Sequence, residues 1–264
     1  VVLAGFASVE QAAAAVGAII GAGIVPAGRE MMDRLSVKAV EAFCSPGSPM
    51  DAEAVLLCEL DGGEADVDEL MAAVLEILRN LEATSQTVSS DEAERLRLWA
   101  GRKNAFPAVG RIRPDYYCMD GTIPRRELPT VLAKITELSE QYGLQVANVF
   151  HAGDGNLHPL ILYDANLEGE LARAEQLGAE ILSLCIAAGG TVTGEHGVGM
   201  EKIDSMCEQF RPAELEQFHA LKRAFDPKGL LNPGKAVPTL HRCAELGAMH
   251  VHGGKLPFPD LPRF

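Results

Sequence analysis

Positive charge is scarce in this 264-residue sequence, in which 23 Lys and Arg stand against 37 Asp and Glu for a formal net charge of -14. Nucleic acids and anionic membranes are bound by clustered Lys and Arg, so the charge balance argues against both kinds of partner. The longest apolar stretch, residues 12–26, contains glycines and is shorter than the roughly 20 residues of a membrane-spanning helix. These shortages exclude a nucleic-acid-binding surface and a membrane span.

Cysteine is also sparse. The six cysteines include no C-x-x-C pair and no iron–sulfur spacing, which favours a reducing, cytoplasmic setting over a disulfide framework. What remains is an ordinary globular composition, with 47% hydrophobic and 23% charged residues. A chain of this length buries a sizeable core as one large or two modest domains.

Hydrophobic periodicity predicts an α+β fold. Ser8 with Gln11 predicts a capped helix start, and Ser36 predicts another. The order strand, helix, strand, strand, helix occurs twice, as in the split βαβ arrangement of a ferredoxin-like unit. We therefore expect a duplicated ferredoxin-like antiparallel sheet with packed helices in residues 1–205, and a C-terminal helical and tail segment in 206–264. The expected strands are 1–6, 24–29, 54–60, 115–121, 144–150, 157–163 and 191–193, and the expected helices 8–23, 36–43, 67–81, 91–104, 125–142, 165–188, 200–210 and 212–225.

The stretch from His151 to Gly199 carries the densest functional signal. Asp154-Gly155 predicts a two-residue hairpin turn, which would place His151 opposite His158 on one face of the ribbon. Two converging imidazoles with a carboxylate form a site for a divalent ion, and Glu195, in the glycine-rich segment GEHGVG, is the candidate third ligand. The alternative is that both histidines are structural.

Long strings of this sequence resemble one family. HAGDGNLHPLILYD, GGTVTGEHGVGMEK and FDPKGLLNPGK resemble the C-terminal half of the FAD-linked oxidases of the vanillyl-alcohol oxidase type. Within that family the resemblance is strongest to the FAD-binding D subunits of bacterial glycolate oxidases, and LWAGRKNAFPAVGRI and PDYYCMDGTIPRRELP extend it over the whole chain.

The resemblance implies a cofactor and residue roles. The enzymes oxidise a 2-hydroxy acid, such as glycolate, by hydride transfer to FAD, assisted by zinc, iron or manganese held by His151, His158 and Glu195. His196 corresponds to the catalytic base, Arg102 to the clamp of the substrate carboxylate, and Asn232 to a residue near the flavin. A second flavin subunit and an iron–sulfur subunit are the implied partners.

The resemblance also leaves alternatives open. D-2-hydroxyglutarate dehydrogenases of the family use a threonine and a lysine where Phe106 and Cys118 stand here, which favours a small 2-hydroxy acid. D-lactate dehydrogenase is an alternative enzyme, and a metal-binding or subunit-assembly module is the non-enzyme alternative. The chain opens on an apolar strand without methionine, so we expect a C-terminal portion of a longer flavoprotein that is inactive and flavin-free by itself. In the tail, two readings stay open for His241, Cys243, His250 and His252: they are soft metal ligands, or they belong, with Phe258 and Phe264, to a Pro-rich surface segment that docks on another domain or subunit.

Overall fold

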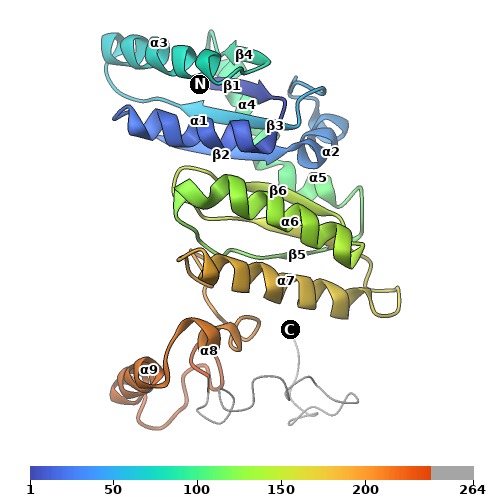
Figure 1. Ribbon diagram of the computed structural model, residues 1–264, viewed down its shortest axis with the longest axis vertical. Coiled ribbons are helices and arrows are strands. Elements are labelled where there is room, and N and C mark those ends of the chain that lie inside the picture. The colour runs from blue at the N-terminus through green and yellow to red at the C-terminus, as the bar shows by residue number, and fades with distance from the viewer. Residues whose placement is uncertain (239–264) are drawn as a thin grey trace. The chain divides into compact units, whose positions relative to one another are not determined.

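The computed structural model describes residues 1–238, and the chain divides into two compact units between His196 and Gly197. In chain order the elements are β1 (Val2–Phe6), α1 (Val9–Gly21), β2 (Gly28–Asp33), α2 (Arg34–Cys44), β3 (Ala54–Glu59), α3 (Glu64–Asn80), β4 (Ser85–Val88), α4 (Glu92–Lys103), α5 (Ala105–Val109), β5 (Asp115–Cys118), η1 (Arg125–Glu127), α6 (Leu128–Tyr142), β6 (Val146–His151), β7 (Pro159–Tyr163), α7 (Glu170–Ala187), α8 (Ser205–Gln209) and α9 (Pro212–Phe225) (Figure 1).

The first unit is built on a sheet made by two similar repeats. Within residues 1–196 the strands pair antiparallel in the order β4-β1-β3-β2-β6-β7-β5. The first four strands, with α1 and α3 as crossovers, have the ferredoxin-like order. β5, β6 and β7, with α6 and α7, repeat it, and the place of a fourth strand is taken by a single bridge between Thr122 and Thr191. The predicted α+β fold with two ferredoxin-like pieces in one sheet is confirmed.

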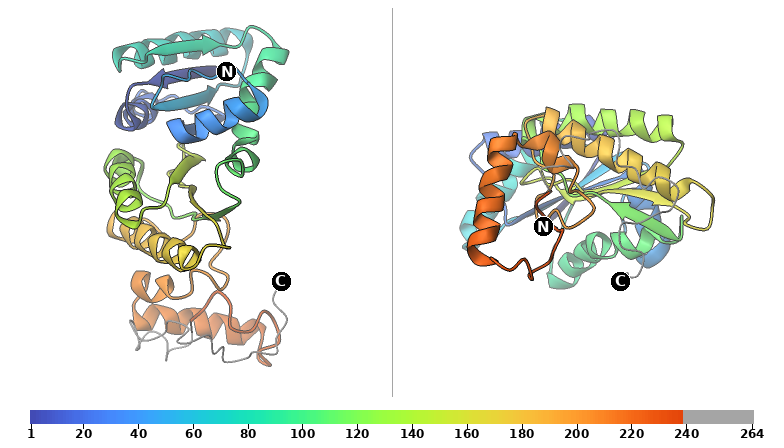
Figure 2. Two further views of the ribbon diagram at one scale, coloured as in Figure 1. Left: turned by 90° about the vertical axis from the view of Figure 1, so that its right-hand side faces the viewer. Right: turned by 90° about the horizontal axis from the view of Figure 1, so that it is seen from below.

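Helices cover both faces of this sheet. α3, α1, α6 and α7 form a row along one face, and α2, α4 and α5 lie against the other (Figures 1 and 2). Alternating side chains of β1 separate accordingly, with Val2, Ala4 and Phe6 in the core of the first face and Leu3 in that of the second, as the two-residue period of a strand requires. The candidate site lies on the second face, beside α4 and α5.

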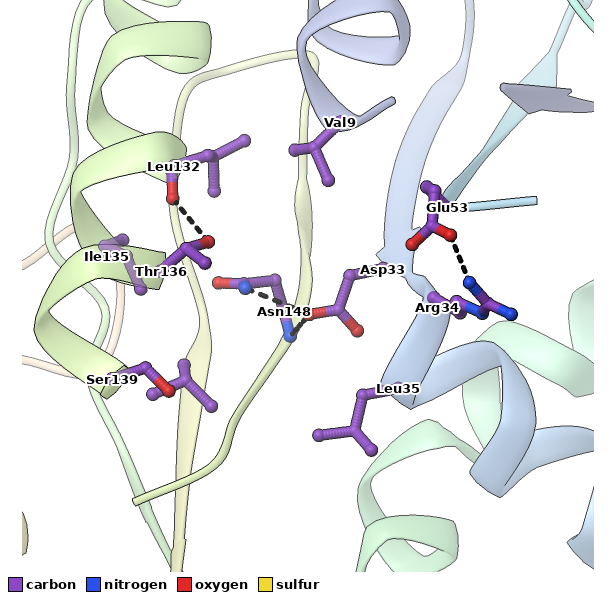
Figure 3. A pocket seen from close by; sticks show the side chains of 11 residues that line it. Val9, Asp33, Arg34, Leu35, Glu53, Leu132, Ile135, Thr136, Ser139 and Asn148 are labelled. Atoms are coloured by element: carbon purple, nitrogen blue, oxygen red, sulfur yellow. Dashed lines mark hydrogen bonds and ion pairs between the residues drawn. The ribbon is translucent and has the colours of Figure 1, made fainter. Parts of the chain in front are cut away.

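The two repeats join through their equivalent strands, β2 and β6. Only three opposed pairs form, with Glu30 facing His151 at one end. Beyond the last pair the side chain of Asp33 links the two strands in place of backbone pairing. Its Oδ2 accepts hydrogen bonds from the backbone N (2.7 Å) and from Nδ2 (3.0 Å) of Asn148. Its Oδ1 accepts from the backbone N and the hydroxyl of Ser36. A pocket opens at this junction, lined by residues of α1, β2, α6 and β6 (Figure 3).

The 24–33 region differs from the prediction. The prediction of a strand at residues 24–29 is wrong, since β2 spans Gly28–Asp33. Pro26 cannot donate a hydrogen bond to a neighbouring strand. The charged Glu30 concealed the hydrophobic pattern of the strand that does form. The helix expected to begin at Ser36 begins at Arg34, capped by Asp33. The Ser8 cap, which accepts from the backbone N of Gln11, is confirmed. The polar edge strand β4 and the short helix α5 were not predicted.

The hairpin prediction is wrong in its register. β6 and β7 pair with Asn148 opposite Pro159, and His151 forms a bridge with Asn156, so His158 falls opposite Val149. The loop therefore has four residues, 152–155. Gly155 has a φ of +75°, and a Cβ there would lie 2.1 Å from the carbonyl oxygen of Ile123, so only glycine suits the position. His151 and His158 become diagonal neighbours that still share a face.

The second unit contains α8 and α9 in its described part. The predicted helix 212–225 is confirmed, whereas the one expected over 200–210 is confined to Ser205–Gln209. Cys44, Cys58, Cys118 and Cys185 are free thiols, while Cys207 is disulfide-bonded, against the expectation from cysteine spacing. No helix within residues 1–238 is both long and apolar enough to cross a bilayer. The predicted docking tail lies outside the described residues.

Candidate metal and substrate site

Three side chains from separate segments converge on the second face of the sheet. His151 ends β6, His158 immediately precedes β7, and Glu195 belongs to the segment that follows α7. Oε1 of Glu195 lies 2.9 Å from Nε2 of His158 and 3.6 Å from Nε2 of His151. One ligand atom from each residue lies within 4.8 Å of the other two. The structure thus brings the three residues predicted to hold a metal into one cluster.

His158 is the most buried member of the cluster, with its side chain only 3% exposed. Neither ring nitrogen has an aligned hydrogen-bond partner within the described chain, although Nε2 is close to Glu195. Burial, together with the nearby His151, lowers the pKa of His158 to about 4. A buried neutral imidazole with an unused nitrogen, a second imidazole and a carboxylate fit a divalent zinc, iron or manganese ion.

Asp120 holds the segment that carries Glu195 and His196. This fully buried carboxylate accepts at Oδ2 from the hydroxyl of Thr193 (2.9 Å) and from the backbone N of Gly194, Glu195 and His196 (3.2, 3.0 and 2.6 Å). Hydrogen bonds to a charged acceptor are among the stronger ones in proteins. The predicted short strand at 191–193 is therefore replaced by a loop wrapped around one carboxylate, whose role sequence reasoning missed.

Arg102 reaches the cluster from the last turn of α4. Its Nε donates to Oε2 of Glu30 at 2.8 Å, and both side chains are nearly buried, at 11% and 9% exposure. The other oxygen of Glu30 lies 2.6 Å from Nδ1 of His151. Because this bond of Arg102 uses Nε, its two terminal nitrogens are left for a bidentate contact with another carboxylate.

His196 and Phe106 complete the surroundings of His158. The His196 ring stacks on the His158 ring with centroids 5.0 Å apart, and the His196 side chain is 44% exposed. Phe106, from α5, meets the edge of His158 at 6.3 Å. An apolar ring therefore borders the buried histidine of the site. Asn232, the residue expected near the flavin, belongs to the second unit, where its φ is +43°.

Comparison with known proteins shows the family to which the chain belongs. Residues 1–236 match the family described as FAD linked oxidases, C-terminal domain. The chain belongs to this family. It is 66% identical over all its 264 residues to the Glycolate oxidase subunit GlcD of Escherichia coli K12, covering 53% of that protein. It is also 30% identical over 236 residues to the Probable D-lactate dehydrogenase, mitochondrial, of Danio rerio, covering 88% of the chain and 47% of the relative.

Solved structures show the same fold. Substrate-bound p-cresol methylhydroxylase superposes with a TM-score of 0.67 at 16% identity, over 91% of this chain and 53% of that one. The chain spans about half the length of the curated relatives it matches. The expected membership among the FAD-linked oxidases, with glycolate oxidase D subunits as close relatives, is confirmed.

Proposed function

We propose that this chain supplies the substrate-binding and metal-binding part of an FAD-dependent oxidoreductase that converts glycolate to glyoxylate. The observation that carries the proposal is the convergence of His151, His158 and Glu195 within reach of one ion, with Arg102 beside them on the same face of the sheet. The 66% identity to a glycolate oxidase subunit supports the choice of substrate.

Each side chain of the site has a role that follows from its chemistry. Arg102 binds the carboxylate of the 2-hydroxy acid through its terminal nitrogens, which orients the substrate. His196, which is more exposed than His151 and His158, takes the hydroxyl proton as general base. His151, His158 and Glu195 would hold the divalent ion, which would supply polarisation of the hydroxyl, and bound FAD would supply the acceptor for the hydride. Phe106 limits the length of the acid and excludes water from the buried side of the site.

Further features of the whole protein belong to the same proposal. Residues 1–205 act as a cap over the substrate, and residues 225–235 return to the flavin domain and bring Asn232 close to the flavin. Electrons pass to a second flavin subunit and an iron–sulfur subunit in the cytoplasm. The relatives with D-lactate dehydrogenase names support D-lactate as the second candidate substrate.

The test uses the full-length flavoprotein that contains this chain, assayed with glycolate or D-lactate and an artificial electron acceptor. Arg102→Met is expected to lower kcat/KM for glycolate roughly 100-fold or more, mainly through KM, because a buried charge contact with the substrate is lost. Arg113→Met is the matched control, since Arg113 only approaches Glu170 at 3.7 Å. Equal kinetics of the two variants, or no turnover of glycolate by the wild-type protein, would contradict the proposal. If kcat/KM is higher for D-lactate than for glycolate, D-lactate takes the place of glycolate as the proposed substrate.

A further inference from the structure

Glu30 lies between two residues to which the proposed function gives separate tasks. It sits on β2 directly opposite His151 on β6, so it comes from the first repeat and His151 from the second. Both of its carboxylate oxygens are engaged, Oε1 with Nδ1 of His151 at 2.6 Å and Oε2 with Nε of Arg102 at 2.8 Å. The residue is only 7% exposed. A carboxylate buried at this level is costly unless it is paired and hydrogen-bonded.

The contact with His151 has a chemical consequence. A carboxylate accepts but does not donate, so the Nδ1 of His151 must carry the hydrogen of this bond. A neutral imidazole then has its lone pair at Nε2, the nitrogen that lies 3.6 Å from Glu195. Histidines that bind metals are commonly oriented by such an outer carboxylate. Glu30 therefore selects the form of His151 that can bind an ion.

The contact with Arg102 has a parallel consequence. A bond through Nε fixes the plane of the guanidinium, because the group is flat and rigid. The hydrogen bond to Glu30 uses Nε, so the N–H groups at the far end of the guanidinium remain available. The same carboxylate thus fixes an imidazole from one repeat and a guanidinium from α4, which no sequence motif connects.

We propose that Glu30 is a positioning residue that sets the tautomer of His151 and the orientation of Arg102 together, and so couples metal binding to substrate binding. The roles of His151 and Arg102 in this statement rest on the proposed function, but the coupling itself is a property of the chain. A glutamine at this position offers one acceptor oxygen and one donor N–H₂, so it can bond to both partners only if His151 changes to the tautomer that accepts at Nδ1.

The first test reads the tautomer directly in the metal-free chain. The protein is labelled with ¹⁵N-histidine and its imidazole nitrogens are recorded by two-bond ¹H–¹⁵N correlation near pH 8, with His151→Gln assigning the signals. We expect the wild-type His151 to be protonated at Nδ1, and Glu30→Leu to shift it toward protonation at Nε2. Unchanged signals of His219 in the second unit and a wild-type circular dichroism spectrum would show that the variant is folded. An unchanged His151 tautomer in Glu30→Leu would overturn the proposal.

The second test measures the affinity for Mn²⁺ and Zn²⁺ by calorimetry. We expect Glu30→Gln to bind about 10- to 100-fold more weakly than wild type, the usual cost of losing an outer-shell partner. Glu53→Gln is the matched control, since Glu53 forms an exposed ion pair with Arg34. Wild-type affinity in Glu30→Gln would overturn the coupling while leaving the proposed function standing. A wild-type chain that binds neither metal would instead count against the proposed function, and the tautomer would still decide the role of Glu30.

Discussion

Nε2 of His158 lies 2.9 Å from Oε1 of Glu195, although β7 and α7 separate the two residues along the chain. The contact is maintained from both sides. The strand register of β6 and β7 fixes His158, and the buried carboxylate of Asp120 fixes the backbone of Glu195. Contacts within the fold thus bring the cluster together.

The stability of the metal-free chain should depend on pH through His158. Its pKa is lowered from 6.5 to about 4 in the folded state, so the folded chain binds fewer protons than the unfolded chain between these values. The contribution of His158 to the unfolding free energy is therefore complete above pH 6.5 and is lost as the pH falls toward 4, by at most about 3 kcal/mol.

Urea unfolding of wild type and His158→Gln, in chelator and at intervals from pH 7.5 to pH 4, measures this dependence. The difference in unfolding free energy between the two proteins should shrink as the pH falls. Parallel curves over the whole range would show that His158 does not resist protonation in the fold.

Removing the Asp120 carboxylate should release the segment that carries Glu195 and His196. Asp120→Ala leaves three backbone N–H groups and one hydroxyl without their shared acceptor, so we expect metal affinity to fall at least 10-fold. We also expect faster hydrogen exchange at residues 194–196. Asp164→Ala is the control, because Asp164 also accepts from loop backbone, at Asn166, but beyond the far end of β7. Equal effects of the two substitutions on metal affinity would contradict the role of Asp120.

Asp33 should matter for stability and not for metal binding. Its four accepted hydrogen bonds hold Ser36 and Asn148 at the junction of the repeats, and Figure 3 shows Asp33 beside Asn148. In Asp33→Asn an amide N–H₂ faces one pair of these donors, so we expect a loss of about 1–3 kcal/mol in unfolding free energy. Glu53→Gln, at the rim of the same pocket, removes an exposed ion pair and should cost less than about 1 kcal/mol. Chemical denaturation of both variants checks the ranking, and a reversed order would refute it.

Burial raises the pKa of Asp33. The direction of this shift predicts how the stability difference between wild type and Asp33→Asn depends on pH. A carboxyl whose folded-state pKa lies above its unfolded value favours the folded state at low pH and costs stability once it ionises. The wild-type advantage over Asp33→Asn should therefore not decline on acidification in the way that a salt-bridged aspartate would produce.

The sequence allowed the fold and much of the site to be predicted, for physical reasons that differ by residue. The Ser8 cap is a local signal, and the repeated order of elements determines the sheet, so this cap and the antiparallel sheet were predicted correctly. His151, His158 and Glu195 were predicted to meet, yet the hairpin register was wrong because Asp154-Gly155 sits in a four-residue loop. In the observed register His151 and His158 are diagonal neighbours and still lie on one face of the sheet. The two histidines therefore meet as predicted, although the predicted register was wrong.

Asp120 and Glu30 could not be found in the same way. Each acts through contacts between segments far apart in the chain, with no local pattern that separates it from a surface carboxylate. The signal available in sequence was indirect: Glu30 is one of three charged residues in β2, and Asp120 lies two residues after β5. Both side chains are buried by segments that are distant in the chain, so their burial can be recognised only from the folded structure.

The most direct test of the account is the metal content of the purified chain, measured by elemental mass spectrometry after incubation with Mn²⁺ or Zn²⁺ and gel filtration. The account predicts roughly one equivalent in the wild type and in His219→Ala, a histidine outside the cluster, and its loss in His158→Ala. No retained ion in the wild type, or an equal content in His158→Ala, would contradict the claim that His151, His158 and Glu195 form a metal site.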